Sequence, residues 1–164
     1  MTLRPVFVGL GSNLGNRRSR LLRALTAIRR RTSVSRVSSF YRTEPVGHAD
    51  QPDFYNAVAE IAWDGAPEEL LAALKEIERE MGRVPRFVNG PREIDLDILE
   101  FRGLVRSGPD PTLPHPRMAA RRFVLAPLAE IAPEWTHPVT GKTAKEMLEE
   151  LPEKPGVERI RGEP

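Results

Sequence analysis

The stretch EIDLDILEF, residues 93–101, alternates apolar and acidic side chains. This period of two predicts a β-strand, because successive side chains of a strand point to opposite faces of a sheet. The aliphatic side chains can then enter a core, while Asp95 and Asp97 project together from the opposite face. The strand therefore carries two neighbouring carboxylates on its non-core side.

The segments that precede this strand supply further strands and two helices. Strand patterns occur at residues 4–10, 33–41 and 54–63. Apolar residues recur at helical spacing after Asn16 and again from Pro67, with Gly82 ending the second helix. The order strand, helix, strand, strand, helix, strand predicts an α/β (α+β) fold: a ferredoxin-like βαββαβ core with a mainly antiparallel sheet flanked by helices.

The sequence after residue 101 predicts additions to this core. Leu104 and Val105 follow a glycine and predict a small edge hairpin. Residues 116–131 and 143–151 have helical patterns, and we expect Pro127 to break the first of these helices. Residues from about 152 to 164 are rich in proline, glycine and charge, which predicts a loose C-terminal tail.

Composition narrows the class of protein. The 164 residues, 40% hydrophobic and 29% charged, fit a single domain spanning 1–164. No apolar run is long enough for a membrane span and no secretory signal is evident, so we expect a cytoplasmic protein with no membrane partner. With no cysteine, a thiolate nucleophile and Cys-based metal sites are excluded, and any metal must be bound by oxygen or histidine.

Charge is unevenly distributed along the chain. Residues 1–42 contain ten arginines and no acidic residue, whereas residues 43–101 contain fourteen acidic and five basic residues. The basic segment permits a nucleic-acid surface, although a solvated arginine face of a helix is the commoner explanation. A ferredoxin-like RNA-binding or regulatory module is the alternative function. The acidic residues on the strand at 93–101 oppose it, and we expect no nucleic-acid partner.

Two glycine-containing motifs do not meet the requirements of known nucleotide-binding loops. In the segment at residues 9–15, the third glycine comes one position too late for a dinucleotide fingerprint, and no acidic residue occurs before Glu44. The sequence Gly141-Lys142-Thr143 lacks the upstream glycine of a phosphate-binding loop and instead predicts a helix start.

Asp95 and Asp97 are the sharpest chemical feature. Adjacent carboxylates raise one another's pKa unless a cation lies between them, and Mg²⁺ typically binds one or two carboxylates together with substrate phosphates. A solvated or arginine-paired strand face remains an alternative. Four groups that suit phosphate oxygens lie near this strand in the sequence: Arg83, Arg92, His115 and Arg121. Together they favour a nucleoside triphosphate, although for each arginine alone an ion-pair role is the commoner one.

Six segments carry a resemblance to a known family. They are VGLGSNLG (8–15), SSFYRT (38–43), QPDFYNA (51–57), GPREIDLDI (90–98), PHPRM (114–118) and RRFVLAPL (121–128). In this order they resemble the 6-hydroxymethyl-7,8-dihydropterin pyrophosphokinases of folate biosynthesis, from about residue 5 to about residue 135. The resemblance implies transfer of the β,γ-diphosphate of ATP to the hydroxymethyl group of the reduced pterin, releasing AMP, with two Mg²⁺ ions.

The resemblance also implies roles for individual residues. Asp95 and Asp97 match the metal ligands. The groups that hold the triphosphate match Arg83, Arg92, His115 and Arg121. Positions of the pterin pocket match Thr43, Pro45, Val46, Phe54, Asn56 and Phe123, where the two phenylalanines can sandwich the flat ring and the amide can meet its edge. Positions that hold the nucleotide match Leu71, Glu78, Ile98 and Thr112.

The chain departs from the family pattern in the loop before the acidic strand. Asn89, which we assign to the pterin pocket, stands where some members carry an aromatic residue. The loop at residues 83–92 is also a residue shorter than in some relatives, which leaves open whether Arg86 contacts a phosphate. We expect a monomer that takes ATP and the pterin as its small-molecule substrates.

Overall fold

The computed structural model describes residues 4–45, 50–154 and 156–160. In chain order these residues form β1 (Val6–Ser12), α1 (Arg17–Arg29), β2 (Ser33–Val37), β3 (Tyr41–Thr43), β4 (Phe54–Ala62), α2 (Pro67–Glu80), β5 (Asp95–Phe101), a 3-10 turn η1 (Met118–Ala120), α3 (Arg122–Ile131), α4 (Ala144–Glu150) and β6 (Val157–Arg159). Within this part of the chain, no helix has the length and apolar character that crossing a membrane requires.

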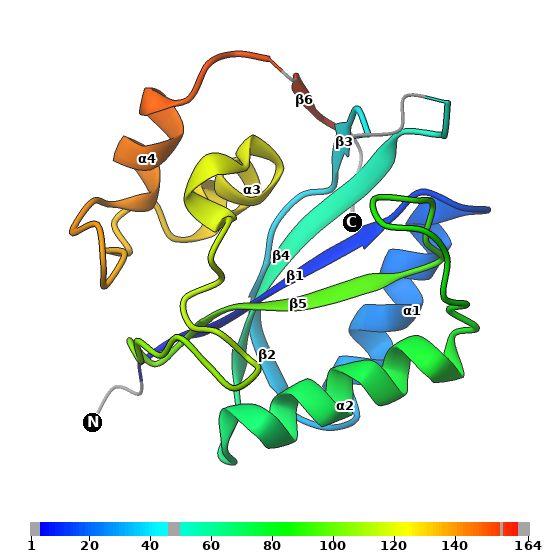
Figure 1. The fold of residues 1–164 in the computed structure, drawn as a ribbon, viewed down its shortest axis with the longest axis horizontal. Coiled ribbons are helices and arrows are strands. Elements are labelled where there is room, and N and C mark those ends of the chain that lie inside the picture. The colour runs from blue at the N-terminus through cyan, green and yellow to red at the C-terminus, as the bar shows by residue number, and fades with distance from the viewer. Residues whose placement is uncertain (1–3, 46–49, 155, 161–164) are drawn as a thin grey trace.

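The strands form one antiparallel sheet with β1 near its centre. The order is β5-β1-β4-β3-β6, and β2 also pairs with β4 (Figure 1). The four strands β5, β1, β4 and β2, connected through α1 and α2, have the ferredoxin-like arrangement. The predicted fold class is therefore confirmed, and the helices that follow β5 are the predicted C-terminal additions.

The sheet separates two hydrophobic cores. On one face α1 and α2 pack through Leu21, Leu25, Leu74 and their neighbours. On the other face α3 and α4 cover a second cluster (Figure 1), which includes Phe7 and Leu99. Successive side chains of β5 point to opposite faces of the sheet. Leu96 and Ile98 enter the first core, and Asp95 and Asp97 lie on the face covered by α3.

Local signals fix the ends of the helices as the sequence predicts. The Asn16 side chain accepts a hydrogen bond from the Ser19 N–H at 3.0 Å and caps α1. Pro67 begins α2, and the Glu69 carboxylate accepts from the Ala66 N–H at 2.8 Å. Thr143 and Glu146 form a capping box at the start of α4.

The strand predicted at residues 33–41 is wrong as a single element, because it divides into β2 and β3. Between them, the Ser39 backbone N–H leaves the ladder and donates to the carboxylate of Glu130 on α3, at 3.0 and 3.1 Å to its two oxygens. A partner 91 residues away therefore decides where the strand breaks. Sequence periodicity within the strand holds no signal for such a contact.

Three further expectations differ from the structure in the C-terminal part. Pro127 lies buried inside α3 rather than breaking it, since a proline in the interior removes only one backbone donor. Leu104 and Val105 follow a turn at Arg102 and Gly103, both with positive φ, and form no strand; the described bridge joins Arg106 and Leu113. The expected loose tail is wrong for residues 157–159, which form β6 on the edge of β3.

Candidate active site

A cavity of about 560 Å³ lies between the sheet and the N-terminal end of α3. Its floor is the backbone of β1 at Gly9 and Gly11, between β4 on one side and β5 on the other. A Cβ atom at Gly11 would lie 2.8 Å from Oδ1 of Asn56, so only glycine fits there without moving the asparagine. Because the glycines have no side chains, the side chains of β4 and β5 face one open surface above β1.

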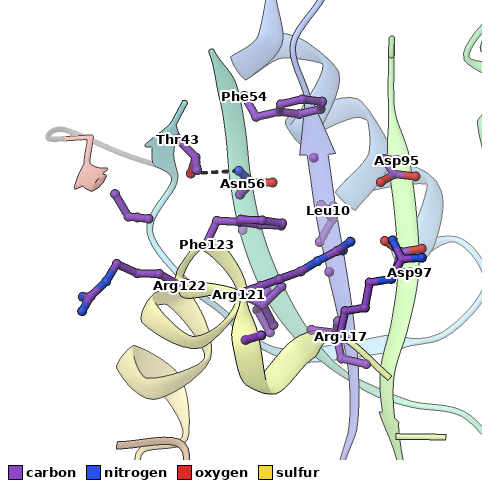
Figure 2. Close-up of a pocket in the computed structure, with 18 of the residues that line it drawn as sticks. Leu10, Thr43, Phe54, Asn56, Asp95, Asp97, Arg117, Arg121, Arg122 and Phe123 are labelled. Atoms are coloured by element: carbon purple, nitrogen blue, oxygen red, sulfur yellow. Dashed lines mark hydrogen bonds between the residues drawn. The ribbon is translucent and has the colours of Figure 1, made fainter. Parts of the chain in front are cut away.

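One half of the cavity is a flat slot between two aromatic rings. Figure 2 shows Phe54 of β4 and Phe123 of α3 facing each other across a gap, with Asn56 and Thr43 beside it. Nδ2 of Asn56 donates to Oγ1 of Thr43 at 3.1 Å, and both side chains are buried. This hydrogen bond fixes the amide so that its oxygen and its second N–H remain available to a ligand.

The other half of the cavity holds the two strand carboxylates. Asp95 accepts from Arg83 Nη1 at 3.0 Å and from Arg92 Nη1 at 2.9 Å. Burial, and then the charges of Asp95 and Glu78, raise the pKa of Asp97 to about 7. A carboxyl group held in this way binds a cation to relieve the repulsion, or binds a proton.

Behind Asp95, a buried carboxylate orients one of the arginines. Oε2 of Glu78 accepts from Arg83 Nη1 at 2.8 Å and from the Leu96 N–H at 2.8 Å. Burial raises the pKa of Glu78, while the hydrogen bond from Leu96 and the charge of Arg83 oppose that shift. Arg83 is thereby held between two acids at the edge of the site.

Arg121 and His115 approach the acids from the α3 side. Figure 2 shows Arg121 extending from the start of α3 toward Asp97, and its burial lowers the pKa of the guanidinium. Burial, followed by the charges of Arg121 and Arg117, lowers the pKa of His115 to about 4. Its Nδ1 accepts from the Arg117 N–H at 3.1 Å, so the neutral imidazole presents its N–H at Nε2.

The structure brings many of the predicted residues to one cavity. Those that line it are Thr43, Phe54, Asn56, Asn89, Arg92, Asp95, Asp97, Arg121 and Phe123. Glu78 and Arg83 reach it through Asp95. The predicted positions Pro45, Leu71, Ile98, Thr112 and His115 do not line it. Val46 lies outside the described residues.

In the loop before β5, Arg86 has a partner within the protein. Its guanidinium makes two hydrogen bonds to Glu93, at 2.8 and 2.6 Å, and this pairing lowers the pKa of Glu93 to about 2. Arg86 is therefore engaged within the loop in this structure. The Asn89 carbonyl accepts from Nε2 of Gln51 at 2.8 Å.

Sequence reasoning missed several residues of the site. Asn13 is fully buried, and its Oδ1 accepts from the Arg92 N–H at 2.8 Å, which fixes the backbone that carries an active-site guanidinium. Asn13 lies within the segment at 8–15 that carries the resemblance, so it could have been found. Lys154 and Val157 also line the cavity, but the composition of the tail gave no signal for them.

The donor set limits which metal could bind. Across residues 4–45, 50–154 and 156–160, no group of three or more His, Asp or Glu side chains is arranged to hold a metal ion. Two carboxylates, Asp95 and Asp97, face the cavity together. Mg²⁺ fits such a pair, because it takes one or two protein carboxylates and fills its remaining positions with water and substrate phosphates.

Comparison with known proteins gives the family. A family model described as 7,8-dihydro-6-hydroxymethylpterin-pyrophosphokinase (HPPK) matches residues 7–133. The chain belongs to this family. The HPPK match spans the segments that form the slot, the acidic strand and the start of α3, so the predicted family is confirmed.

Relatives support this assignment along the whole chain. The chain is 43% identical over 162 residues to the 2-amino-4-hydroxy-6-hydroxymethyldihydropteridine pyrophosphokinase of Pseudomonas aeruginosa, covering 98% of this chain and 99% of that one. It is 38% identical to the folic acid synthesis protein FOL1 of Dictyostelium discoideum. The match covers 90% of this chain but only 22% of that longer protein. A crystal structure of Plasmodium falciparum HPPK-DHPS, 14% identical, has the same fold with a TM-score of 0.70, covering 90% of this chain and 44% of that one.

Proposed function

We propose that this HPPK-family chain transfers the β,γ-diphosphate of ATP to the hydroxymethyl oxygen of 6-hydroxymethyl-7,8-dihydropterin and releases AMP. The observation that carries the proposal is the juxtaposition in one cavity of a flat aromatic slot and a half-buried acid pair flanked by guanidinium groups. The slot suits a planar heterocycle, and the charged half suits a polyphosphate with its cation. A bond forms between the hydroxymethyl oxygen and the β-phosphorus as the bond from that phosphorus to the α-phosphate oxygen breaks; AMP leaves with that oxygen, and the hydroxyl proton passes to solvent.

The pterin is bound by its faces and its polar edge. Phe54 and Phe123 stack on the two faces of the ring, and Asn56 offers an acceptor and a donor to its amide edge. Thr43 fixes the orientation of that amide. The hydroxymethyl group then extends along the β1 floor toward Asp97.

The triphosphate is held by the cationic side chains around the acid pair. Arg92 and Arg121 line the cavity together with the carboxylates, and Arg83 donates to Asp95. The neutral imidazole of His115, which does not line the cavity, would donate from Nε2 to a phosphate oxygen. The guanidiniums position the diphosphate for in-line transfer and neutralise its charge, which accounts for most of the catalysis of phosphoryl transfer.

Asp95 and Asp97 would hold two Mg²⁺ ions together with the phosphates of ATP. When bound, Mg²⁺ supplies positive charge to the phosphate oxygens and to the leaving group. Release of Asp95 from Arg83 and Arg92 frees its oxygens for this role and the two guanidiniums for phosphate. We further propose that Leu71, Glu78, Ile98 and Thr112 hold the nucleotide, that Pro45 and Asn89 contact the pterin, and that the chain acts as a monomeric single domain.

The test is to incubate the protein with ATP, Mg²⁺ and 6-hydroxymethyl-7,8-dihydropterin and to separate the nucleotides. The proposal requires AMP in a one-to-one ratio with pterin diphosphate, with no AMP when the pterin is omitted or the metal is chelated by EDTA. Formation of ADP would contradict diphosphate transfer, and absence of turnover by a folded protein would contradict the proposed reaction.

A further inference from the structure

Glu130, in the last turn of α3, is bonded to the strand that forms the side wall of the slot. Its carboxylate accepts from the Ser39 N–H at 3.0 and 3.1 Å, from the Ser39 hydroxyl at 2.9 Å and from the Tyr41 hydroxyl at 2.7 Å. Nη2 of Arg159 on β6 lies 3.5 Å away. One side chain of α3 therefore contacts the β2–β3 junction, β3 itself and β6.

Strand register connects these contacts to the slot. Tyr41 pairs with Asn56 and Thr43 pairs with Phe54, so the side chains of these four residues lie on the face toward α3. Tyr41 is two residues from Thr43 on a strand of only three residues. A bond to the Tyr41 hydroxyl therefore controls the position of Thr43, and through it the amide of Asn56.

The same helix carries the opposite wall. Phe123 and Glu130 are seven residues apart, which is about two helical turns, so both lie on the side of α3 that faces the sheet. At the other end of α3, the Arg122 guanidinium donates to the carbonyls of Leu151 and Pro152, both at 3.1 Å. The helix is thus tied at each end, and its distance from β3 sets the width of the slot.

The charges of α3 oppose its dipole at both ends. Arg121 and Arg122 lie at the N-terminus and Glu130 in the last turn, with no acidic residue in the first turn and no basic residue in the last. This arrangement of charges would destabilise the helix if it were isolated. Such helix preferences are overridden where the side chains serve a functional site.

We propose that Glu130 is a positioning residue for the pterin, which sets the separation between Phe123 and the strand pair that carries Thr43, Asn56 and Phe54. This inference rests on the proposed function, because it assumes that the slot binds the pterin. Glu130 touches no substrate in this scheme. Its effect is on the binding of the ring and not on the binding of the nucleotide.

The experiment compares four variants with the wild-type chain. Isothermal titration measures the dissociation constant (Kd) of 6-hydroxymethyl-7,8-dihydropterin in the presence of Mg²⁺ and the unreactive analogue α,β-methylene-ATP, and separately the Kd of the analogue. Glu130→Ala should raise the Kd of the pterin about tenfold and leave that of the analogue unchanged, since a charged acceptor that orders one wall is lost. Glu130→Gln should restore most of the affinity, because its amide oxygen accepts from Tyr41 and from the Ser39 N–H.

Glu68→Ala is the control. Glu68 lies on α2, which packs on the other face of the sheet, and it accepts from Arg106 Nη2 at 2.5 Å. Its loss should leave the Kd of the pterin and that of the analogue unchanged. Equal pterin affinity in Glu130→Ala and wild type would overturn the proposal, as would equal weakening of pterin and analogue.

The fourth variant covers the case in which Glu130→Ala does not fold. Tyr41→Phe removes only the hydroxyl that donates to Glu130, and should raise the Kd of the pterin about threefold; an unchanged Kd would overturn the proposal. The wild-type titration separates the two hypotheses, since a wild-type chain that binds no pterin contradicts the proposed function itself. A wild type that binds, with variants that bind equally well, contradicts only the role of Glu130.

Discussion

At the scale of single residues, Asp97 differs from Asp95 in what holds its charge. Asp95 has two guanidinium partners, whereas Asp97 is half-buried near Asp95 and Glu78, and its partial burial and their charges raise its pKa to about 7. For an acid whose pKa is raised on folding, the native state is favoured while the group is protonated. Stability therefore falls as the pH rises from 3.8 to about 7 in the absence of metal.

Asp97→Asn should reduce diphosphate transfer by a factor on the order of 1,000 and increase the free energy of unfolding of the metal-free protein at pH 8. The amide keeps the shape of the side chain and removes the unpaired charge. Turnover assays and urea unfolding measure the two effects. Asp95→Asn is the comparison: it should lose activity without a gain in stability, because Arg92 loses its carboxylate partner and Arg83 loses one of its two. Retained activity in Asp97→Asn would refute its assignment as a metal ligand.

His115 gives a pH dependence of the opposite sign. Its pKa is lowered from 6.5 to about 4 on folding, so the unfolded chain binds a proton first as the pH falls. As the pH falls from 6.5 to 4, the free energy of unfolding of the wild type should fall relative to that of His115→Gln. The expected change is about 1 to 2 kcal/mol after allowance for solvent screening. Urea unfolding at four pH values measures it. An imidazole that titrates near 6.5 by NMR would contradict the lowering of its pKa by burial.

At the scale of elements, the glycines of β1 determine how closely the side chains of neighbouring strands can approach its backbone. Gly11→Ala places a Cβ atom 2.8 Å from Oδ1 of Asn56. We expect the Kd of the pterin to rise about tenfold, because the amide must move to relieve the contact. Gly156→Ala, whose added carbon meets no atom within 4 Å, is the control. Wild-type affinity in Gly11→Ala would show that the amide does not meet the ring.

Strand β6 covers the outer edge of β3. A chain ending at Lys154 lacks this strand together with Val157, which lines the cavity. Its pterin Kd should rise about fivefold, since β3 then has a ladder on one side only. Glu158→Ala removes only the exposed ion pair with Arg42 and should change nothing measurable. A truncated chain with wild-type affinity would exclude β6 from the binding wall.

These elements also show where sequence periodicity succeeds and fails. The alternation of β5 is local, so the common face of Asp95 and Asp97 could be predicted, as could the capped helices α1 and α2. The break between β2 and β3 depends on Glu130, and the pairing of β6 depends on an edge formed far away in the sequence. The attachment of Arg83 to both Glu78 and Asp95 likewise depends on how a loop returns to the sheet.

At the scale of the whole molecule, one sheet serves as a wall of both cores. The chain has two tryptophans, and each reports on a different core: Trp63 packs against the cluster under α1 and α2, and Trp135 against the cluster under α3 and α4. Because β1, β4 and β5 contribute to both clusters, neither core can lose its packing without disturbing the other.

Single-tryptophan variants test this coupling. In Trp63→Phe and in Trp135→Phe, the remaining fluorescence transition in urea should coincide with the far-ultraviolet circular dichroism transition of the same variant. Comparison within each variant removes any difference in overall stability. A fluorescence midpoint that precedes the dichroism midpoint in one variant would mean that the corresponding layer unfolds separately.

The glycine floor of β1 also constrains how the range of ligands that this cavity accepts can evolve. Gly9 and Gly11 already lack side chains, so no mutation can deepen the site by removing atoms there. Substitutions at these positions act in one direction only, toward a shallower site. Acceptance of a larger ring must therefore come from the walls, through changes at Phe54, Phe123 or the contacts that hold α3.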